Sequence, residues 1–448
     1  MPSTEYAPEP PTDAEAQAQP LAASIGEMPE APHGAPAGAA DVPVIERLLT
    51  ASSAGDLVGF TRLLVQPEPH GLDETALRVL LAETLLHQDP TAERHVRVVE
   101  DMLGALPPPR PFIDRWPANA SLRARMVLGY MYRGLGRSAE ALEAFRQAFG
   151  WRPDIAECAD CLAYQLEMMG DAAGAARVRE EHAGLAAQTI DQLPPWTPPA
   201  AAVDPRGRYL DLLERSLCNM IYGDASHSSY GDTRYDVARR LTGRDLPTEA
   251  HSMIGLTRLR HLRWAAETVL SEGVPGNFIE AGVWRGGACI LMAGVLAAHG
   301  DVHRQVFVAD SFAGLPPPDP RYAQDLATQH DFHLRPELAV GTAQVAANFR
   351  RYDLLNENIR FVEGWFVDTL PPLKNEIFAI LRLDGDLYSS TMDTLVPLYD
   401  SVAPGGFVIC DDFGIVLDAR RAIIDFRKER GITNHMFAID GDGIYWRK

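Results

Sequence analysis

The chain has 448 residues, 46% of them hydrophobic, and a formal net charge of −20 at pH 7. This length suits two or three domains with ordinary globular cores. The negative charge argues against a general nucleic-acid-binding protein, because contacts to phosphates need clustered Lys and Arg. The five Cys, an odd number spread along the chain, indicate reduced thiols rather than a disulfide framework.

Residues 1–40 are rich in Pro, Ala and Glu and hold almost no large apolar side chains. We expect them to form a disordered leader, because they bury too little surface to offset the loss of chain entropy. The N-terminus lacks the basic region and apolar core of a secretory signal, and the chain has no apolar run long enough to span a bilayer. These features predict a cytoplasmic protein without a membrane span.

Residues 41–188 have the apolar spacing of helices. Between Leu122 and Pro153, small residues, aromatics, a turn glycine and a final proline fall where the 34-residue tetratricopeptide pattern wants them. They are Gly129, Tyr132, Gly136, Ala141, Phe145, Ala148 and Pro153. A shift of 34 positions takes Gly136 to Gly170 and Ala141 to Ala175, which fit again. This domain resembles tetratricopeptide repeats; a generic helical bundle is the alternative.

Residues 189–205 hold five prolines and are predicted to be a Pro-rich linker. The second domain, residues 206–448, opens with two amphipathic helices predicted at 209–222 and 252–270. Neither has the pattern of a strand in a parallel sheet, so we expect them to cover the ligand end of such a sheet. A long stretch without clear periodicity, residues 314–337, is predicted to be a lid, with a tolerated insertion as the alternative.

The most informative stretch spans residues 377–413. Apolar runs at 377–383 and 406–410 flank a helical pattern at 391–402, which predicts a parallel β-α-β unit. Each strand leads into acids at its carboxyl end, where ligands bind in such sheets. These acids are Asp384, Asp386, Asp411 and Asp412. Carboxylates gathered together repel one another, so a divalent cation with oxygen ligands, such as Mg²⁺, is the expected compensation; capping of helices and turns is the alternative.

Further elements complete an alternating α/β pattern. Strands are predicted at 277–282, 305–309 and 359–364, and helices from the glycine turn after the first strand to about 299, at 340–352 and at 418–430. Asp310 ends the second strand, where an acid is placed to hold the ribose hydroxyls of a nucleoside. Arg382, inside a strand, is expected to pair with a carboxylate. Two short strands around residues 440–443 predict a final hairpin, and an antiparallel last strand favours the methyltransferase variant of the fold.

Ten segments in order carry a family resemblance. They are Tyr209-Leu210-Asp211-Leu212, Asn219-Met220-Ile221-Tyr222, Gly243-Arg244-Asp245, Ser252-Met253-Ile254-Gly255, Ile279-Glu280-Ala281-Gly282-Val283-Trp284-Arg285-Gly286-Gly287, Ala309-Asp310-Ser311-Phe312, Gly364-Trp365-Phe366, Arg382-Leu383-Asp384-Gly385-Asp386-Leu387-Tyr388, Pro404-Gly405-Gly406 and Asp411-Asp412. With them, residues 206–448 resemble the macrocin O-methyltransferase (TylF/MycF-type) family, which methylates sugar hydroxyls of macrolides and related natural products. The helical half has no counterpart in this resemblance.

The resemblance implies a class I methyltransferase fold, a Rossmann-like parallel sheet with an antiparallel terminal strand, that uses S-adenosylmethionine and Mg²⁺ or another divalent cation. It implies three metal ligands, namely Asp384, Asp411 and Asp412. The implied cofactor-binding residues are Met253, Ile254, Glu280, Gly282, Asp310, Ser311 and Trp365. Of these, Glu280 and Gly282 would lie beside the methionine end, and Met253 and Ile254 would close over the cofactor. Asp384 and Asp386 are the catalytic candidates, with Asp386 as the general base.

The chemistry suits an acceptor with two neighbouring hydroxyls, because a vicinal diol can chelate the open positions of a metal. We therefore predict an O-methyltransferase acting on a hydroxylated natural product in secondary metabolism. A nicotinamide oxidoreductase is disfavoured by the missing G-x-G-x-x-G motif. The remaining alternative is a tetratricopeptide interaction protein with an inactive methyltransferase-like domain. The acceptor, the oligomeric state (including a homo-oligomer) and a protein partner of the helical half stay open.

Overall fold

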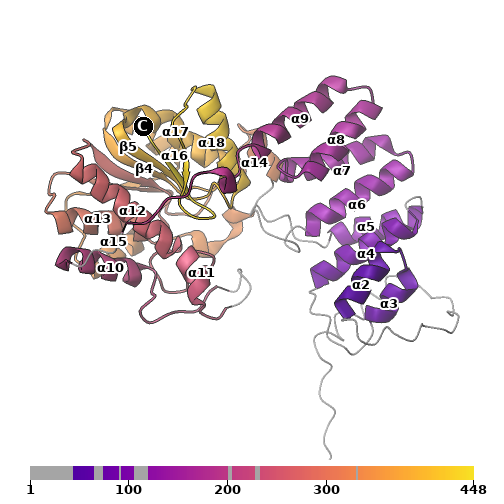
Figure 1. Cartoon of the computed structure of the whole chain (residues 1–448), viewed down its shortest axis with the longest axis horizontal. Helices are drawn as coiled ribbons and strands as arrows, with labels where there is room; N and C mark the ends of the chain where they lie inside the picture. The colour runs from indigo at the N-terminus through magenta and orange to yellow at the C-terminus, as the bar shows by residue number, and fades with distance from the viewer. Residues whose placement is uncertain are drawn as a thin grey trace, which may run out of the picture. The chain divides into compact units, whose positions relative to one another are not determined.

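The computed structural model of the protein describes residues 44–64, 74–89, 92–104, 120–199, 204–227, 233–328 and 331–448. The chain divides into two compact units, one reaching Ala183 and the other running from Gly184 to Lys448 (Figure 1). The predicted leader, residues 1–40, lies outside the described residues. No helix in the described ranges is both long enough and apolar enough to cross a membrane.

The first unit is helical in the part that the structure describes. Its helices are α2 (Val44–Ser53), α3 (Leu57–Leu64), α4 (Glu74–Gln88), α5 (Glu93–Gly104), α6 (Ala120–Gly134), α7 (Ser138–Trp151), α8 (Ala156–Met168) and α9 (Ala172–Ala186). Within the pair α6 and α7, Gly129 lies so close to Phe145 that a Cβ added to the glycine would come 2.5 Å from the ring. The small residue therefore allows the two helices to approach, and the predicted all-helical domain is confirmed.

The second unit is built on a seven-stranded sheet in the order β3-β2-β1-β4-β5-β7-β6. The strands are β1 (Asn277–Ala281), β2 (Val306–Asp310), β3 (Ile359–Glu363), β4 (Phe378–Leu383), β5 (Val402–Cys410), β6 (Phe437–Ala438) and β7 (Ile444–Arg447). Strands β1 to β5 are parallel, whereas β7 is antiparallel to β5 and β6 is antiparallel to β7. The predicted parallel sheet with an antiparallel end and a final hairpin is thus confirmed.

Helices cover both faces of this sheet. They are α10 (Pro205–Leu217), α11 (Val237–Thr242), α12 (Gly255–Ser271), α13 (Gly287–His299), α14 (Ala323–Thr328), α15 (Thr342–Arg351), α16 (Phe366–Thr369), α17 (Tyr388–Leu398) and α18 (Leu417–Glu429). Side chains of α10, α12, α13 and α15 share one core cluster with one face of the strands. Side chains of α17 and α18 form a second cluster with the other face. Strand order reverses between β1 and β4, and in such sheets a ligand crevice opens at this point.

Three elements differ from the sequence-based prediction. The helix predicted at 209–222 is α10, which begins at Pro205 because the Asp204 carboxylate caps it by accepting from Gly207 N at 2.7 Å. It ends at Leu217, shortly before Asn219 takes a positive φ of 49°. The predicted lid contains the short helix α14 and two single turns of 3₁₀ helix, all too short to give a periodic pattern. Helix α17 begins at Tyr388, earlier than predicted.

Part of the predicted linker packs on the second unit. Ile190 is buried in the core cluster that includes α17 and α18. Trp196 N donates to Ala438 O at 2.7 Å, and Ala438 N donates to Pro194 O at 3.0 Å, so the chain here runs along β6. The prolines lack a donor N–H, which suits a segment at the edge of a sheet.

A buried histidine in this unit makes its stability depend on pH. His261 of α12 is fully buried among Trp196, Trp264 and Tyr445, and neither ring nitrogen has a hydrogen-bond partner among the residues that the structure describes. Burial, with a smaller effect of Arg382, lowers the pKa of His261 to about 3. The unfolded chain, with an ordinary histidine pKa, therefore binds the proton more readily, and the folded state loses stability as the pH falls through about 6.5.

We expect His261→Phe to become more stable relative to the native protein as the pH is lowered. Between pH 7.5 and 5.5 the difference in unfolding free energy between the two should shift by about 1.4 kcal/mol in favour of the variant. Chemical denaturation at both pH values measures this shift. The matched control, His303→Phe, changes an exposed histidine and should show no shift; an equal shift in both variants would contradict the prediction.

Candidate active site

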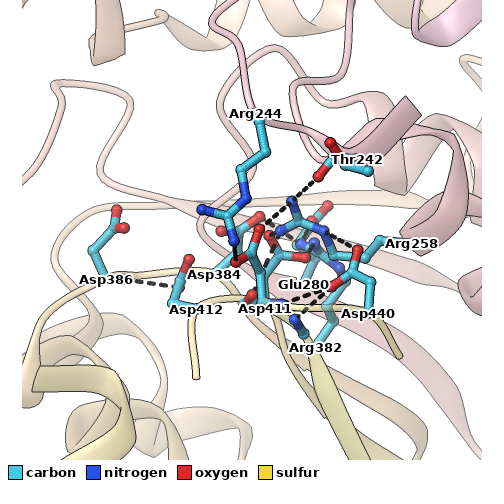
Figure 2. Close-up of polar contacts among 12 residues, drawn as sticks. Thr242, Arg244, Arg258, Glu280, Arg382, Asp384, Asp386, Asp411, Asp412 and Asp440 are labelled. Atoms are coloured by element: carbon cyan, nitrogen blue, oxygen red, sulfur yellow. Dashed lines mark hydrogen bonds and ion pairs between the residues drawn. The ribbon is translucent and has the colours of Figure 1, made fainter. Parts of the chain in front are cut away.

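Three carboxylates meet at the carboxyl ends of β4 and β5. Asp384 follows β4, and Asp411 and Asp412 follow β5. One carboxylate oxygen from each lies within 4.8 Å of the other two, a spacing that suits a shared metal ion. The backbone N of Asp386 donates to Asp412 Oδ2 at 3.2 Å, while the Asp386 carboxylate lies apart from this group (Figure 2). The structure thus brings together the three predicted metal ligands and holds the backbone of the predicted base next to one of them.

A buried arginine lies beneath these acids. Arg382 of β4 is 1% exposed and pairs in register with Glu280 of β1. Its guanidinium donates to Glu280, to Asp384 Oδ2 at 2.6 Å and to Asp411 Oδ1. Burial opposes the positive charge, but Asp411, Asp384 and Glu280 outweigh it and raise the pKa of Arg382 well above its usual value. The predicted pairing of Arg382 with carboxylates is confirmed, and the residue ties β1, β4 and β5 together.

A second buried arginine reaches the site from the helix layer. Arg258 of α12 donates to Asp411 Oδ2, so both oxygens of this carboxylate accept from guanidinium groups (Figure 2). Its Nε lies 3.2 Å from Asp440 Oδ2, and its second terminal nitrogen lies 3.5 Å from Asp442 Oδ2. Arg244 also donates to Asp442. The turn between β6 and β7 therefore belongs to the site, although the sequence had indicated only a glycine turn there.

The acids of this network outnumber its arginines. The acids are Glu280, Asp384, Asp386, Asp411, Asp412, Asp440 and Asp442, and the arginines are Arg244, Arg258 and Arg382. Burial, together with repulsion from neighbouring carboxylates, raises the pKa of Asp384 to about 6 and that of Asp386 to about 7. The same causes raise the pKa of Asp412. Such a donor set of crowded carboxylate oxygens fits a hard divalent cation.

The exits of β1 and β4, which are the backbone segments directly after the carboxyl ends of these strands, are in close contact. Asp384 N donates to Ala281 O at 2.9 Å, and the Asp384 carbonyl oxygen would lie 1.8 Å from a Cβ built on Gly282, which has φ 93°. Only glycine permits this approach. Gly282, predicted to lie beside the cofactor, is thus also what allows the Asp384 backbone to reach its position.

Asp310, the residue predicted to bind the ribose, holds the loop after β1. Asp310 Oδ2 accepts from Val283 N at 2.7 Å, and Asp310 Oδ1 accepts from Phe312 N at 2.7 Å. Burial is the main cause that raises the pKa of Asp310 despite these hydrogen bonds. Ser311 follows directly, and its hydroxyl donates to Gly314 O at 2.6 Å. Asp310 thus orders the glycine turn at the end of β1.

The other predicted cofactor residues occupy different environments. Glu280 is 2% exposed and accepts from Cys289 Sγ at 2.9 Å as well as from Arg382. Ile254 packs in the core cluster, whereas Met253 is half-buried. Trp365, after β3, is 41% exposed. Glu280 therefore belongs to the buried ionic network, and Met253 and Trp365 keep accessible side-chain surface.

Strained backbone gathers at the same edge of the sheet. Trp284, Phe312 and Asp386 have positive φ angles of 46°, 54° and 58°, and they follow β1, β2 and β4 respectively. Such conformations cost free energy in residues other than glycine and tend to cluster at functional sites. Asp386 is therefore held in a conformation that its own backbone does not prefer.

Residues 206–448, more than half of the chain, match the model of a family described as Macrocin-O-methyltransferase (TylF). The chain belongs to the TylF family. It is 48% identical over 249 residues to the 8-demethyl-8-(2,3-dimethoxy-alpha-L-rhamnosyl)-tetracenomycin-C 4'-O-methyltransferase of Streptomyces olivaceus, across 54% of this chain and 94% of the relative. It is 45% identical over 245 residues to the demethyldecarbamoylnovobiocin O-methyltransferase of Streptomyces niveus, across 54% of this chain and 93% of the relative.

A solved structure supports the same assignment. The O-methyltransferase NovP matches with a TM-score of 0.51 and 44% sequence identity, across 54% of this chain and 99% of NovP. The predicted resemblance of the C-terminal part is confirmed: this TylF family member is an O-methyltransferase that uses S-adenosylmethionine. The family match begins at residue 206, so it does not assign the helical unit.

We expect Gly282→Ala to damage the active site more than an ordinary glycine substitution would. The added methyl group collides with the Asp384 carbonyl, so Asp384 has to move, and the variant should lose about 2 kcal/mol of stability beyond the cost of a positive φ. Methyl transfer should fall with it. Thermal unfolding and a methyl-transfer assay measure these effects.

Gly300→Ala is the matched control. Gly300 also has a positive φ, of 69°, but a Cβ there would meet no atom within 4 Å. It should lose only about 1 kcal/mol from the backbone strain and keep its activity. Equal losses in the two variants would show that the contact with Asp384 is unimportant.

Proposed function

We propose that this enzyme methylates a sugar hydroxyl of a natural product, with the help of a divalent cation held by Asp384, Asp411 and Asp412. The observation that carries the proposal is the meeting of these three carboxylates at the carboxyl ends of β4 and β5, next to the β1 exit. The Streptomyces olivaceus relative, by its name, acts at the 4' position of a rhamnosyl compound. A deoxysugar hydroxyl is the acceptor that suits both facts. The rhamnosyl group in that name carries methoxy groups at positions 2 and 3, so a second free hydroxyl beside the acceptor is our proposal from the metal chemistry alone.

The methyl donor would lie along the exits of β1 and β2. The glycine turn after β1, ordered by Asp310, offers close backbone approach, and Asp310 with Ser311 would hold the ribose. Glu280 and Gly282 would border the methionine end, while Met253, Ile254 and Trp365 would enclose the cofactor. This arrangement would bring the sulfonium methyl near the boundary between β1 and β4, beside the carboxylates.

A divalent cation on these carboxylates would supply positive charge that makes an acceptor hydroxyl more acidic and fixes its direction. The side chains of the enzyme carry out the remaining steps. Asp386, whose pKa is raised to about 7, is the proposed base that takes the hydroxyl proton. S-adenosylmethionine, held by the residues named above, would supply the methyl group to the acceptor oxygen and would become S-adenosylhomocysteine. Holding donor and acceptor next to each other would supply much of the acceleration.

We expect Asp412→Asn to remove the cation site while leaving the arginine network in place, because Arg258 and Arg382 bind Asp411 and not Asp412. In calorimetric titrations the variant should bind S-adenosylmethionine as the Mg²⁺-free native protein does and lose the Mg²⁺ isotherm. Methyl transfer to a rhamnoside with two neighbouring free hydroxyls should fall about 10²-fold or more, as it should for the native enzyme in chelator.

Asp400→Asn is the control. Asp400 is an exposed acid just before the start of β5, away from the site, and it pairs with Arg430. It should keep both Mg²⁺ binding and activity. Full activity of Asp412→Asn in chelator would argue against a metal-assisted reaction. Equal rates on a rhamnoside that lacks the second hydroxyl would argue against a diol acceptor.

We expect Asp386→Asn to slow the chemical step without weakening ligand binding. An amide cannot take the hydroxyl proton, so kcat should fall by about 10²- to 10⁴-fold, while the dissociation constants for S-adenosylmethionine and Mg²⁺ stay unchanged. Single-turnover kinetics and calorimetry separate these quantities. An unchanged kcat would remove Asp386 as the base.

We also propose that residues 41–188 form a tetratricopeptide-like domain that binds a protein partner, joined through residues 189–205 to the methyltransferase domain at 206–448. Gly136 and Gly170, 34 positions apart in the repeat pattern, both take a positive φ after a helix. On α8, Tyr164 is 47% exposed and Met168 is 67% exposed, which gives the domain an apolar surface. Aromatic and Met side chains are typical of partner-binding surfaces.

A pull-down with the full chain tests this docking proposal. A partner that the native protein retains and that Tyr164→Glu/Met168→Glu releases would support it. The variant should keep its methyltransferase activity, because the substitutions lie in the helical unit. Recovery of no protein above background would contradict the proposal.

A further inference from the structure

Arg258 makes a contact to the site that the proposed function does not explain. Arg382 lies on β4 and Asp411 directly follows the neighbouring strand β5, but Arg258 reaches Asp411 from α12, in the helix layer. Each oxygen of a carboxylate has two lone pairs, so Asp411 can accept from both arginines and still face a cation. Arg258 therefore fixes one ligand oxygen from outside the sheet.

The other partners of Arg258 belong to two further segments. Besides Asp440 and Asp442 of the β6–β7 turn, the guanidinium donates to Thr242 O, at the end of α11, at 3.2 Å. The side chain is 6% exposed, and removal of any such buried charge partner is costly. One guanidinium thus joins α11, α12, the β6–β7 turn and the exit of β5 (Figure 2).

Helix α12 also begins at the proposed cofactor-binding residues. Met253 and Ile254 directly precede Gly255, the first residue of α12, and Arg258 lies one turn further on. Gly255, with φ 80°, is packed so tightly that a Cβ there would come 2.3 Å from Gly243 N. Because the start of the helix is tightly packed, Met253, Ile254 and Arg258 should move together. A displacement of Met253 and Ile254 therefore also displaces Arg258.

We propose that Arg258 is a positioning residue that couples cofactor binding to cation binding. This role of Arg258 rests on the proposed function, in which Met253 and Ile254 enclose the cofactor and Asp411 is a ligand of the cation. Cofactor binding sets the position of α12, and Arg258 then holds the Asp411 carboxylate in the orientation that the cation requires. Because such coupling is reciprocal, Mg²⁺ must tighten cofactor binding by the same factor.

Calorimetry on the full chain measures this coupling directly. Mg²⁺ is titrated with and without S-adenosylhomocysteine, and S-adenosylhomocysteine is titrated with and without Mg²⁺. For the native protein we expect each ligand to tighten the other by the same factor, about 5-fold or more. For Arg258→Lys, which keeps the charge but loses the planar fork, the factor should fall toward 1 while each ligand alone still binds.

Arg260→Lys is the matched control. Arg260 lies on the same helix, is largely exposed and pairs with Asp211 and Glu214, away from the site. It should keep the native coupling factor. Should Arg258→Lys fail to fold, Asp442→Asn provides a second variant: it removes one anchor of Arg258 and should reduce the factor.

The outcomes separate the two proposals. Native coupling in Arg258→Lys, or in Asp442→Asn where the lysine variant does not fold, would overturn the role of Arg258. So would the absence of any coupling in a native protein that binds both ligands. If the folded native protein binds no Mg²⁺, the proposed function itself fails.

Discussion

The structure depends on the burial of several carboxylates at one edge of a sheet. A charge taken out of water costs several kcal/mol unless it is paired with good geometry. Arg382, placed on a central strand and 1% exposed, meets this condition for Glu280, Asp384 and Asp411 together. The Arg382 guanidinium therefore supplies a positive charge inside the core of the sheet. The acids that it does not pair with remain available to a ligand.

Strand order decides where these acids meet. β1 and β4 are neighbours at the point where the strand order reverses, so the glycine turn after β1 and the acids after β4 open onto the same place. The contact between Gly282 and the Asp384 carbonyl shows how closely the two exits approach. The proposed site for a nucleoside-bearing donor and the proposed site for a cation would thus share one boundary, which is what a transfer between two bound molecules requires.

Much of this was predictable because local patterns determine it. Buried strands give continuous apolar runs, and in parallel strands the carboxyl ends meet, so the proximity of Asp384 and Asp411 followed from the sequence. The contact between Arg258 and Asp411 could not be predicted, because Arg258 lies 153 positions from Asp411 and the sequence of its helix does not indicate which residue it will face. Helix α14 was missed because a six-residue helix has too few turns for periodicity. The first and last residues of α10 were not predicted, because they depend on an N-terminal cap and on the backbone conformation of Asn219.

The antiparallel end of the sheet has a consequence for the order in which the protein can form. β7 follows every other strand in the sequence, yet it lies inside the sheet, between β5 and β6. The turn that brings Asp440 and Asp442 to Arg258 immediately precedes it. During synthesis the ribosome delivers this turn after the rest of the site, so nascent chains carry an incomplete ion network. The active site is therefore completed only after the turn and β7 have been synthesised.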